Sequence, residues 1–321
     1  MSTHSLRVGI VMDPIESITP YKDSSLAMLL EATRRDAEIH YFNQSDLKVI
    51  SGTAMGHSRQ LSVQDDRSCW WQFKAEQEVA LGDLDVILMR KDPPFDMEYI
   101  YTTYILDRAK QAGAVIMNDP QALRDMNEKF YTSWFPDLAP VTLISRSMDE
   151  MRTFLAEHGH VVVKPLDGMG GRSIFVIKHG DKNANVVFET LTDFGRQFAM
   201  AQTYIPEISM GDKRILLMDG EPVPYALARI PAADDNRGNL VMGAVGKGQE
   251  LSDRDREICA RIGPILKERD VIFAGIDVIG DYLTEVNVTS PTGMREIDDQ
   301  FGTNSAGLMF DAIERRLGRI D

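Results

Sequence analysis

Basic residues, cysteine and long apolar runs are all scarce in this chain, and each shortage excludes a class of protein. Lys and Arg number 35 against 49 Asp and Glu, which gives a net charge of -14, so nucleic acid is not expected as a partner. The only cysteines, Cys69 and Cys259, lie far apart in the sequence, which favours a reducing compartment over a disulfide framework. No apolar stretch approaches the roughly 18 residues of a membrane span, and no signal-peptide core follows Met1. We therefore expect a cytoplasmic protein without a membrane partner.

The residues that are abundant indicate a globular protein of mixed α/β type. A chain of 321 residues with 43% apolar residues is long enough for two or three compact units. It opens with an apolar strand at 6–12, a helix at 24–35 behind the N-cap residue Asp23, and a second strand at 39–42. A β-α-β order predicts parallel strands.

The rest of the chain continues to alternate between strands and helices. A helix is expected after residue 118, with Leu123, Met126, Phe130 and Trp134 on one face and Lys129 on another. Further helices are expected at 98–112, at 147–159, after Ser252 and at 305–317, and further strands at 49–63, 86–89, 114–117, 161–164, 173–178, 198–205, 214–218, 223–230, 271–277 and 283–288. The long segment 231–248 has little periodicity and is expected to be a lid loop.

A glycine-rich hairpin lies at the centre of the sequence. Val161-Val-Val-Lys-Pro-Leu-Asp-Gly-Met-Gly-Gly carries Lys164 from an apolar strand into a loop that contains Gly168, Gly170 and Gly171. Glycines at positive φ bring backbone N–H groups against an anion, and a lysine adds a point charge. The pattern indicates a phosphate-binding lid, although a plain hairpin turn would also be rich in glycine.

A second hairpin, at 274–287, carries oxygen ligands. Glu285 and Asn287 lie two residues apart on one face of a strand, and Asp277 is opposite or diagonal to them. A buried carboxylate needs a partner, and Mg²⁺ prefers oxygen ligands. The alternative is that these acids form ion pairs with arginines on a solvated sheet face.

Four other sequence motifs accompany these two hairpins. They are Asp212-Lys-Arg-Ile, Asn287-Val-Thr-Ser-Pro-Thr-Gly293, the opening Gly-Ile-Val-Met-Asp13-Pro, and Met89-Arg-Lys-Asp-Pro-Pro-Phe-Asp96. Together with the hairpins they resemble the ATP-grasp ligases and, within that family, the bacterial glutathione synthetases. The resemblance covers nearly the whole chain.

The resemblance implies both a fold and a reaction. The fold would be α/β (α+β), with an N-terminal parallel α/β domain at 1–122, a central lid-bearing ATP-grasp subdomain at 123–201 and a C-terminal antiparallel-sheet domain at 202–321. The reaction would join γ-glutamylcysteine and glycine through an acyl phosphate, with ATP cleaved to ADP and phosphate. Mg²⁺ would be the cofactor, with Mn²⁺ as an alternative, and the protein would be a homo-oligomer, a tetramer.

The resemblance also implies a role for individual residues. The nucleotide would be bound by Lys129, Lys164, Gly168, Gly170, Gly171, Gln202, Tyr204, Ile205 and Asp212; the catalytic residues would be Arg214 and Arg229; the metal ligands would be Asp277, Glu285 and Asn287; and the substrates would be bound by Arg90, Ser290, Thr292 and Gly293.

Several of these roles have a plainer alternative. Lys129 on a helix could be a solvated charge, Arg90 could pair with Asp92 or Asp96, and the segment 202–205 could be an ordinary apolar strand. Residues 290–293 could form a Ser-Pro turn. Two other functions also fit the motifs, namely a sister ligase for other amino acids or D-alanine and a non-catalytic ATP-binding module, although the complete set of lysines and metal ligands argues against the module.

Overall fold

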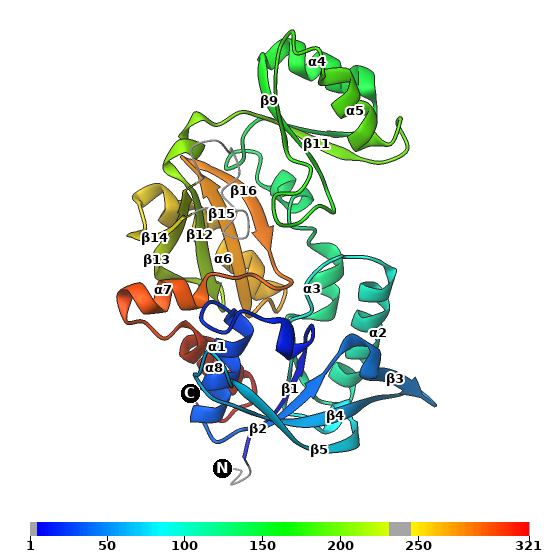
Figure 1. The fold of residues 1–321 in the computed structure, drawn as a ribbon, viewed down its shortest axis with the longest axis vertical. Helices are drawn as coiled ribbons and strands as arrows, with labels where there is room; N and C mark the ends of the chain where they lie inside the picture. The colour runs from blue at the N-terminus through cyan, green and yellow to red at the C-terminus, as the bar shows by residue number, and fades with distance from the viewer. Residues whose placement is uncertain (1–4, 231–244, 321) are drawn as a thin grey trace.

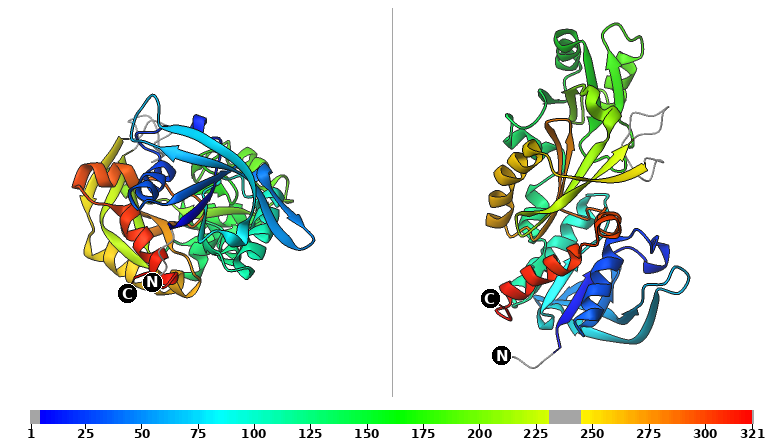
Figure 2. Two further views of the ribbon diagram at one scale, coloured as in Figure 1. Left: turned by 90° about the horizontal axis from the view of Figure 1, so that it is seen from below. Right: turned by 90° about the vertical axis from the view of Figure 1, so that its left-hand side faces the viewer.

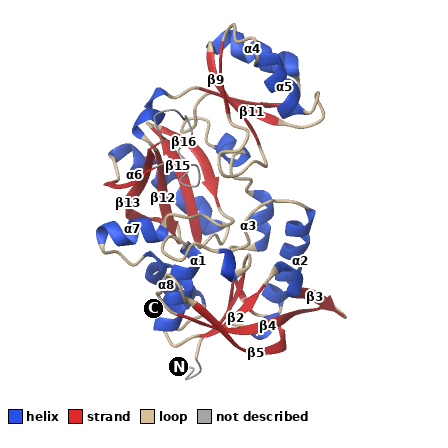
Figure 3. Cartoon of the chain, viewed as in Figure 1, coloured by secondary structure: helices blue, strands red, loops and turns tan. Residues whose placement is uncertain are grey.

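The computed structural model describes residues 5–230 and 245–320. Within these ranges the chain forms three sheets that follow one another along the long axis of the molecule (Figure 1). Helices cover each sheet, as Figure 3 shows. Short 3₁₀ helices occur at Ile15–Ser17, Gln44–Asp46, Leu81–Asp83, Phe130–Trp134 and Pro206–Met210.

The first sheet has seven strands. They are β1 Arg7–Val11, β2 Glu38–Phe42, β3 Leu47–Ile50, β4 Thr53–Val63, β5 Trp71–Ala80, β6 Val86–Met89 and β7 Val115–Met117. Their order is β3-β4-β2-β1-β6-β7, with β5 paired to β4. The strands β2, β1, β6 and β7 run parallel to one another, which confirms the predicted β-α-β opening. The expected short strands at 49–63 are instead the hairpin of β3 and β4, with β4 continuing into a long ribbon with β5.

The strand β5 was not recognised in the sequence. Its first residues alternate, with Trp71 and Phe73 half-buried against the core and Gln72 and Lys74 exposed, but residues 75–78 are all exposed. The alternation is therefore too short to indicate a ten-residue strand.

Four helices surround the first sheet: α1 Ser24–Arg34, α2 Met97–Gln111, α3 Pro120–Asp125 and α8 Ser305–Arg316. The Asp23 carboxylate accepts a hydrogen bond from the Leu26 N–H at 2.7 Å, which confirms the predicted N-cap of α1. The C-terminal helix α8 lies beside α1 (Figures 1 and 2), and the Arg35 guanidinium joins them through Asp311 at 2.6 Å.

The second sheet is small and entirely antiparallel. Its strands are β8 Thr142–Ser145, β9 His160–Pro165, β10 Phe175–Lys178 and β11 Ala199–Thr203, in the order β10-β9-β11-β8. The helices α4 Met148–His158 and α5 Ala184–Thr192 pack on one face. The opposite face, with Val162, Lys164 and Val176, lines a cavity. The pairing of β9 with β10 confirms the predicted glycine-rich hairpin.

The third sheet has five antiparallel strands. They are β12 Asp212–Met218, β13 Glu221–Ile230, β14 Val245–Glu250, β15 Phe273–Ile279 and β16 Tyr282–Asn287, in the order β14-β13-β12-β15-β16. The helices α6 Asp253–Glu268 and α7 Met294–Phe301 accompany it. The pairing of β15 with β16 confirms the predicted hairpin at 274–287, and the strands expected at 214–218 and 223–230 pair with each other as β12 and β13. Most of the expected lid, residues 231–244, lies outside the described residues, and residues 245–248 belong to β14 rather than to a loop.

The continuous helix expected after residue 118 is wrong. The helix α3 ends at Asp125, and a 3₁₀ helix follows at Phe130–Trp134. Although Met126 is buried, Phe130 and Trp134 are 37% and 57% exposed. The helix at 305–317 was also expected to bury Leu308, but Leu308 in α8 is 47% exposed.

Both cysteines are free thiols, Cys69 on the surface and Cys259 buried. Across residues 5–230 and 245–320, none of the helices combines the length and the apolar character that a bilayer span requires.

Candidate active site

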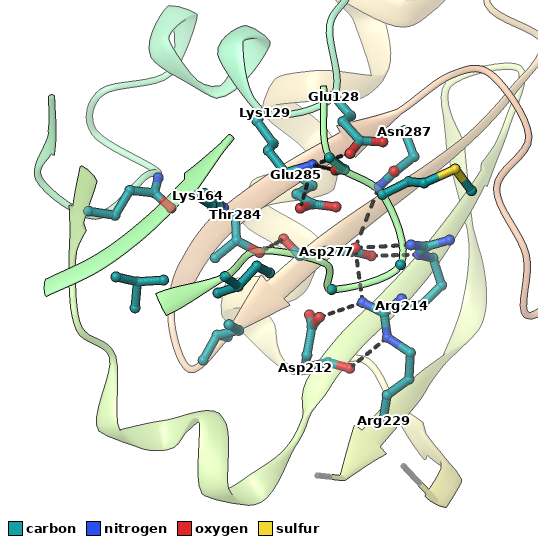
Figure 4. A pocket seen from close by; sticks show the side chains of 18 of the residues that line it. Glu128, Lys129, Lys164, Asp212, Arg214, Arg229, Asp277, Thr284, Glu285 and Asn287 are labelled. Carbon is teal, nitrogen blue, oxygen red and sulfur yellow. Dashed lines mark hydrogen bonds and ion pairs between the residues drawn. The ribbon is translucent and has the colours of Figure 1, made fainter. Parts of the chain in front are cut away.

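A cavity of about 310 Å³ lies between the second and third sheets, and most of the predicted site residues line it. They reach it from different elements: Lys164 from β9, Gln202 from β11, Arg214 from β12, Arg229 from β13 and Glu285 from β16. Figure 4 shows the charged side chains converging on this space. Residues that are far apart in the sequence therefore form one site.

The Asp277 carboxylate lies at the centre of the charged residues on the third sheet. Its oxygens accept from Arg214 Nε at 2.5 Å and from Arg214 Nη2 at 2.9 Å, and Arg229 Nη2 lies 2.9 Å away (Figure 4). Burial alone would raise the pKa of the Asp277 carboxyl, but the two guanidinium groups overcome burial and hold the pKa below its usual range. The predicted alternative of an acid paired with arginines is therefore correct for Asp277, although the pairs lie in a buried cavity and not on a solvated face.

Asp212 extends this network by one more charge. Its Oδ2 accepts from Arg229 Nη2 at 2.5 Å, while its Oδ1 is buried without a hydrogen-bond partner among the described residues. Burial raises the pKa of Asp212 to about 7, although the neighbouring Arg229 guanidinium lowers it. The order of charges is thus Asp212, Arg229, Asp277, Arg214.

Lys129 approaches the same cavity from the segment that precedes the 3₁₀ helix. It is 2% exposed, so the alternative of a solvated charge is wrong. The ammonium contacts the carboxylate of Glu128, lies 3.5 Å from Glu285 Oε1 and donates to the Gly168 carbonyl at 2.6 Å. Burial lowers the pKa of Lys129, but Glu285 and Glu128 more than offset that effect. The ammonium stays charged.

Lys164 differs from Lys129 in its surroundings. It is 5% exposed and lies on the cavity face of β9. Burial lowers the pKa of the Lys164 ammonium, which Glu285 only partly restores. The nearby acids offset only part of the cost of burying the Lys164 charge. An anion that enters the cavity would therefore stabilise the charged form of Lys164.

The glycine loop between β9 and β10 forms one wall of the cavity. Gly170 and Gly171 have φ of +66° and +77°, as expected, whereas Gly168 does not have a positive φ. A Cβ atom at Gly168 would lie 2.6 Å from Pro165 Cγ. Gly168 therefore allows close packing, and the other two glycines allow the turn. Arg172, the residue that follows, is exposed.

The segment 202–205 closes the end of the cavity on the side of the second sheet. Gln202 is 3% exposed and donates from Nε2 to Thr142 Oγ1 at 3.0 Å. The ring of Tyr204 stacks on His160 at a centroid distance of 3.9 Å. Together with Val162 and Val176, this segment makes one end of the cavity largely apolar, whereas the charged side chains lie at the other end.

The segment 290–293 is held at three consecutive residues. Ser290 Oγ donates to Asp92 Oδ1 at 2.5 Å, the Pro291 carbonyl accepts from Arg90 Nη2 at 3.1 Å, and the Thr292 carbonyl accepts from Arg214 Nη1 at 3.3 Å. The next residue, Gly293, has φ +105° and precedes α7. Ser290 and Thr292 line the cavity.

Arg90 lies behind this segment, outside the cavity lining. Its Nε donates to Ser25 Oγ at 3.0 Å, and its Nη1 is buried without a hydrogen-bond partner among the described residues. Burial lowers the pKa of Arg90. The alternative ion pair with Asp92 or Asp96 does not form within the described ranges, because Asp92 accepts from Ser290 and Asp96 caps α2 through the Tyr99 N–H.

The oxygen ligands predicted for a metal lie together in the cavity. Asp277 and Glu285 are direct partners in the pairing of β15 with β16, and Asn287 Nδ2 is 3.5 Å from Asp277 Oδ2. No group of three or more His, Cys, Asp and Glu side chains suited to a metal ion occurs in the part of the chain that the structure describes. The candidate set is therefore two carboxylates and one amide, which fits a hard cation that takes its other ligands from water or phosphate.

Glu128 is a residue of the site that the sequence analysis missed. It lines the cavity beside Lys129, and burial and the nearby Glu285 raise the pKa of its carboxyl. Its signal in the sequence was only its position next to a lysine.

The sequence matches two family models and several characterised proteins. A family model described as the prokaryotic glutathione synthetase N-terminal domain matches residues 6–124, and one described as the prokaryotic glutathione synthetase ATP-grasp domain matches residues 128–302. The glutathione synthetase of Vibrio cholerae is 54% identical over 312 residues, covering 97% of this chain and 98% of that protein. The glutathione synthetase of Salmonella typhimurium is 54% identical over 314 residues, covering 98% and 100%.

Solved structures with low sequence identity share the fold. The D-cycloserine synthetase DcsG has a TM-score of 0.69 at 14% identity, covering 97% of this chain and 99% of that one. The D-alanyl-alanine synthetase A from Vibrio cholerae has a TM-score of 0.61 at 11% identity, covering 98% and 99%. Together with the matching ATP-grasp family model, these likenesses confirm the predicted fold class.

Proposed function

The chain belongs to the prokaryotic glutathione synthetases, which are ATP-grasp ligases, and from that premise we propose which of its residues bind the nucleotide, the metal ion and the substrates. The activity is the ATP-dependent joining of γ-glutamylcysteine and glycine to glutathione through an acyl phosphate, with release of ADP and phosphate. One observation carries the proposal: two lysines, two arginines and a carboxylate pair, from the second and third sheets and from the segment before the 3₁₀ helix at Phe130–Trp134, line a single cavity.

The nucleotide is proposed to lie along the cavity with its base at the apolar end. Gln202, Tyr204 and Ile205 would contact the base, and Asp212 would contact the ribose side. The phosphates would extend towards Lys129 and Lys164. Both ammonium groups are already in the cavity, and the acids around Lys164 only partly offset its burial, which supports this direction.

A divalent cation would be held by Asp277, Glu285 and Asn287, and we propose Mg²⁺ as the ion, with Mn²⁺ as a substitute. When bound, the ion neutralises phosphate charge and fixes the orientation of the phosphate oxygens. The two carboxylates and the amide are held in register by the pairing of β15 with β16. Two solved structures of the ATP-grasp ligase PsnB, which shares the fold, are complexes that contain Mg and ADP.

Arg214 and Arg229 are proposed as the catalytic residues that stabilise phosphoryl transfer. The cysteinyl carboxylate attacks the γ-phosphorus, and negative charge accumulates on the transferred group and on the leaving ADP oxygen. A guanidinium group stays charged and presents parallel N–H donors to such oxygens. Because both arginines are already aligned by Asp277, little reorientation would be needed at the moment of transfer.

The acyl phosphate would next be attacked by the amine of glycine, and water must be kept away from it. Gly168, Gly170 and Gly171 form the loop that covers this side of the cavity. Exclusion of water by a covering loop prevents hydrolysis of reactive intermediates.

The substrates are proposed to bind where the first domain meets the segment 290–293. Ser290, Thr292 and Gly293 would supply hydroxyl and backbone groups to a substrate carboxylate or to glycine. Arg90 would act on the dipeptide from the first domain. Support comes from its Nη1, which has no hydrogen-bond partner among the described residues, and from its contact with the Pro291 carbonyl.

Three broader features are also proposed. The proposed domain boundaries are 1–122, 123–201 and 202–321, and each unit holds most of one sheet, although the second boundary falls within β11. A homotetramer would cover exposed apolar side chains on the first sheet and α2, where Ile50, Tyr101 and Tyr104 are each about half exposed. Light scattering on the purified protein tests the tetramer. A cytoplasmic location stays a prediction.

The activity is tested by incubating the protein with Mg-ATP, γ-glutamylcysteine and glycine and detecting the tripeptide by mass. Parallel reactions replace the substrates with D-alanine or with other amino acid pairs. ADP release and tripeptide formation are expected only with γ-glutamylcysteine and glycine. Faster ADP release with another carboxylate and amine pair would assign the chain to a sister ligase.

A further inference from the structure

Asn127 connects the two elements that present the lysines of the cavity, and it lies outside the lining of the main cavity. We propose that Asn127 is a positioning residue that holds the glycine loop, through the Leu166 carbonyl, at a fixed place relative to Lys129. The inference rests on the proposed function in one respect, since it takes the main cavity to be the phosphate site.

The oxygen of the Asn127 side chain shapes the segment that carries Lys129. Oδ1 accepts from the Lys129 N–H at 3.2 Å and from the Phe130 N–H at 2.9 Å. An Asn that caps backbone N–H groups competes with continuation of a helix, which explains why α3 ends at Asp125 and a separate 3₁₀ helix begins at Phe130. This break aims the Lys129 side chain into the cavity.

The nitrogen of the same side chain holds the glycine loop. Nδ2 donates to the Leu166 carbonyl at 3.1 Å, and Leu166 directly follows Pro165, the last residue of β9, which carries Lys164. Lys129 adds a second bond, from its ammonium to the Gly168 carbonyl at 2.6 Å. Asn127 and Lys129 therefore both hold the first half of the loop.

The two bonds respond differently to an arriving phosphate. The Lys129 ammonium has three N–H donors; it bonds Glu128 and the Gly168 carbonyl, and it lies 3.5 Å from Glu285 Oε1. A phosphate oxygen that binds Lys129 competes with the Gly168 carbonyl for these donors, and the uncharged carbonyl is the weaker acceptor of the two. After the exchange, the bond from Asn127 to Leu166 is the one that still ties the loop to this segment.

Asn127 is not among the residues that line the main cavity. It lines a smaller space of about 30 Å³ with Phe95 and Leu166, and this space adjoins the main cavity, since Glu128, Met169 and Thr289 are among the residues that line both. The Asn127 side chain bonds the loop at Leu166 and the backbone N–H of Lys129, so its effect on nucleotide binding is expected to pass through the loop and Lys129.

The variant Asn127→Ser tests the inference, because serine keeps a neutral oxygen acceptor for the cap and lacks the amide donor to Leu166. Amide hydrogen exchange of residues 166–172 is measured in the nucleotide-free protein. We expect exchange about fivefold faster than in wild type, the scale of one hydrogen bond, with no change in β9. The KM for ATP is expected to rise by about the same factor, while the KM for γ-glutamylcysteine and kcat change by less than about twofold.

The matched control is Asn304→Ser. Asn304 also accepts a cap bond, from the Gly307 N–H at 2.9 Å, and donates to a distant acceptor, Glu31 Oε2, at 3.3 Å. It lies at α8, away from the cavity, so Asn304→Ser should leave loop exchange and the KM for ATP unchanged. If Asn127→Ser does not fold, Asn127→Asp, whose carboxylate also caps and lacks the donor, is measured for loop exchange.

The outcomes separate the inference from the proposed function. Loop exchange in Asn127→Ser or Asn127→Asp equal to wild type would overturn the inference, as would an equal rise in the KM values of ATP and dipeptide. A wild-type protein that makes no tripeptide would instead refute the proposed function. Loop exchange measured without nucleotide would still decide whether Asn127 holds the loop.

Discussion

Replacing either acid of the candidate metal set should abolish most activity, but only one of the two replacements should destabilise the protein. Asp277→Asn removes the charge that pairs with Arg214 and Arg229, and the side chain of Asp277 is 4% exposed. Glu285→Gln removes a charge that is 20% exposed and lies 3.5 Å from Lys129. The two variants are isosteric with the native residues and face each other across β15 and β16, so each is the control for the other.

The magnitudes follow from the burial of the pairs. Removing one partner of a buried ion pair costs about 3–5 kcal/mol because the remaining charge stays buried. The amide that replaces the Asp277 carboxylate keeps one acceptor oxygen, and Asp212 still faces Arg229 at 2.5 Å, so we expect a loss near the lower value, about 3 kcal/mol. The longer and more exposed Glu285 contact should contribute about 1 kcal/mol or less. Turnover should fall about 100-fold or more in both, the scale of lost electrostatic stabilisation of a transition state.

The assay measures unfolding in urea with EDTA present, so that no metal ion contributes, and steady-state ligation with Mg-ATP. If Asp277→Asn proved as stable as Glu285→Gln, the pairing of Asp277 with the two arginines would not stabilise the native state as described. If either variant retained near wild-type turnover, that residue would leave the metal set.

Further predictions concern the thiols, Asp212 and Arg90. Burial raises the pKa of Cys259 to about 12, so a thiol reagent at pH 8 should label Cys69 alone in the native protein and both residues after unfolding; rapid native labelling of Cys259 would contradict its burial. The pKa of Asp212 is about 7 in the folded protein against an ordinary 3.8, so the folded state holds the extra proton between these values, and this contribution to stability is lost as pH rises from about 4 to about 7. Urea unfolding of wild type and of Asp212→Asn measures this contribution. The free energy of unfolding of wild type, relative to that of the variant, should be smaller at pH 7.5 than at pH 5. A difference that does not change with pH would refute the raised pKa. Arg90→Lys should raise the KM for γ-glutamylcysteine about tenfold or more with little change in the KM for ATP, because a lysine cannot contact Ser25 and Pro291 together; steady-state kinetics with each substrate varied would show equal effects if Arg90 did not act on the dipeptide.

The sequence predicted those parts of the fold whose side chains follow a regular period. The opening β1, α1 and β2 were recognisable because one buried face repeats along each element and Asp23 marks the start of the helix. The strand β5 alternates only over its first residues, and residues 75–78 are all exposed. The helix α5, although apolar, was not assigned to any element.

The break after α3 shows why local patterns can mislead. Leu123, Met126, Phe130 and Trp134 have helical spacing, but the Asn127 side chain takes the N–H groups of Lys129 and Phe130. These two hydrogen bonds depend on the tertiary position of Asn127, because the same side chain also donates to the Leu166 carbonyl. The prediction therefore placed Lys129 on a helix face, whereas tertiary contacts bury it in the cavity.

The site was more predictable in its membership than in its contacts. The predicted acids and lysines, with Arg214 and Arg229 but not Arg90, line one cavity. Strand alternation fixes which side chains of the sheets share a face. The ion pairs from Asp277 to Arg214 and Arg229 could not be read from the sequence, since they depend on β12 pairing with β13 on one side and with β15 on the other. The place of Arg90 behind Pro291 depends on the docking of the first sheet against the third.

The most direct test of the central claim is a crystal structure of the protein with a non-hydrolysable ATP analogue and Mg²⁺. The account predicts the triphosphate beside Lys129 and Lys164 under the glycine loop, with the cation on Asp277, Glu285 and Asn287. A triphosphate bound outside this cavity, or a cation without any of these three ligands, would contradict it.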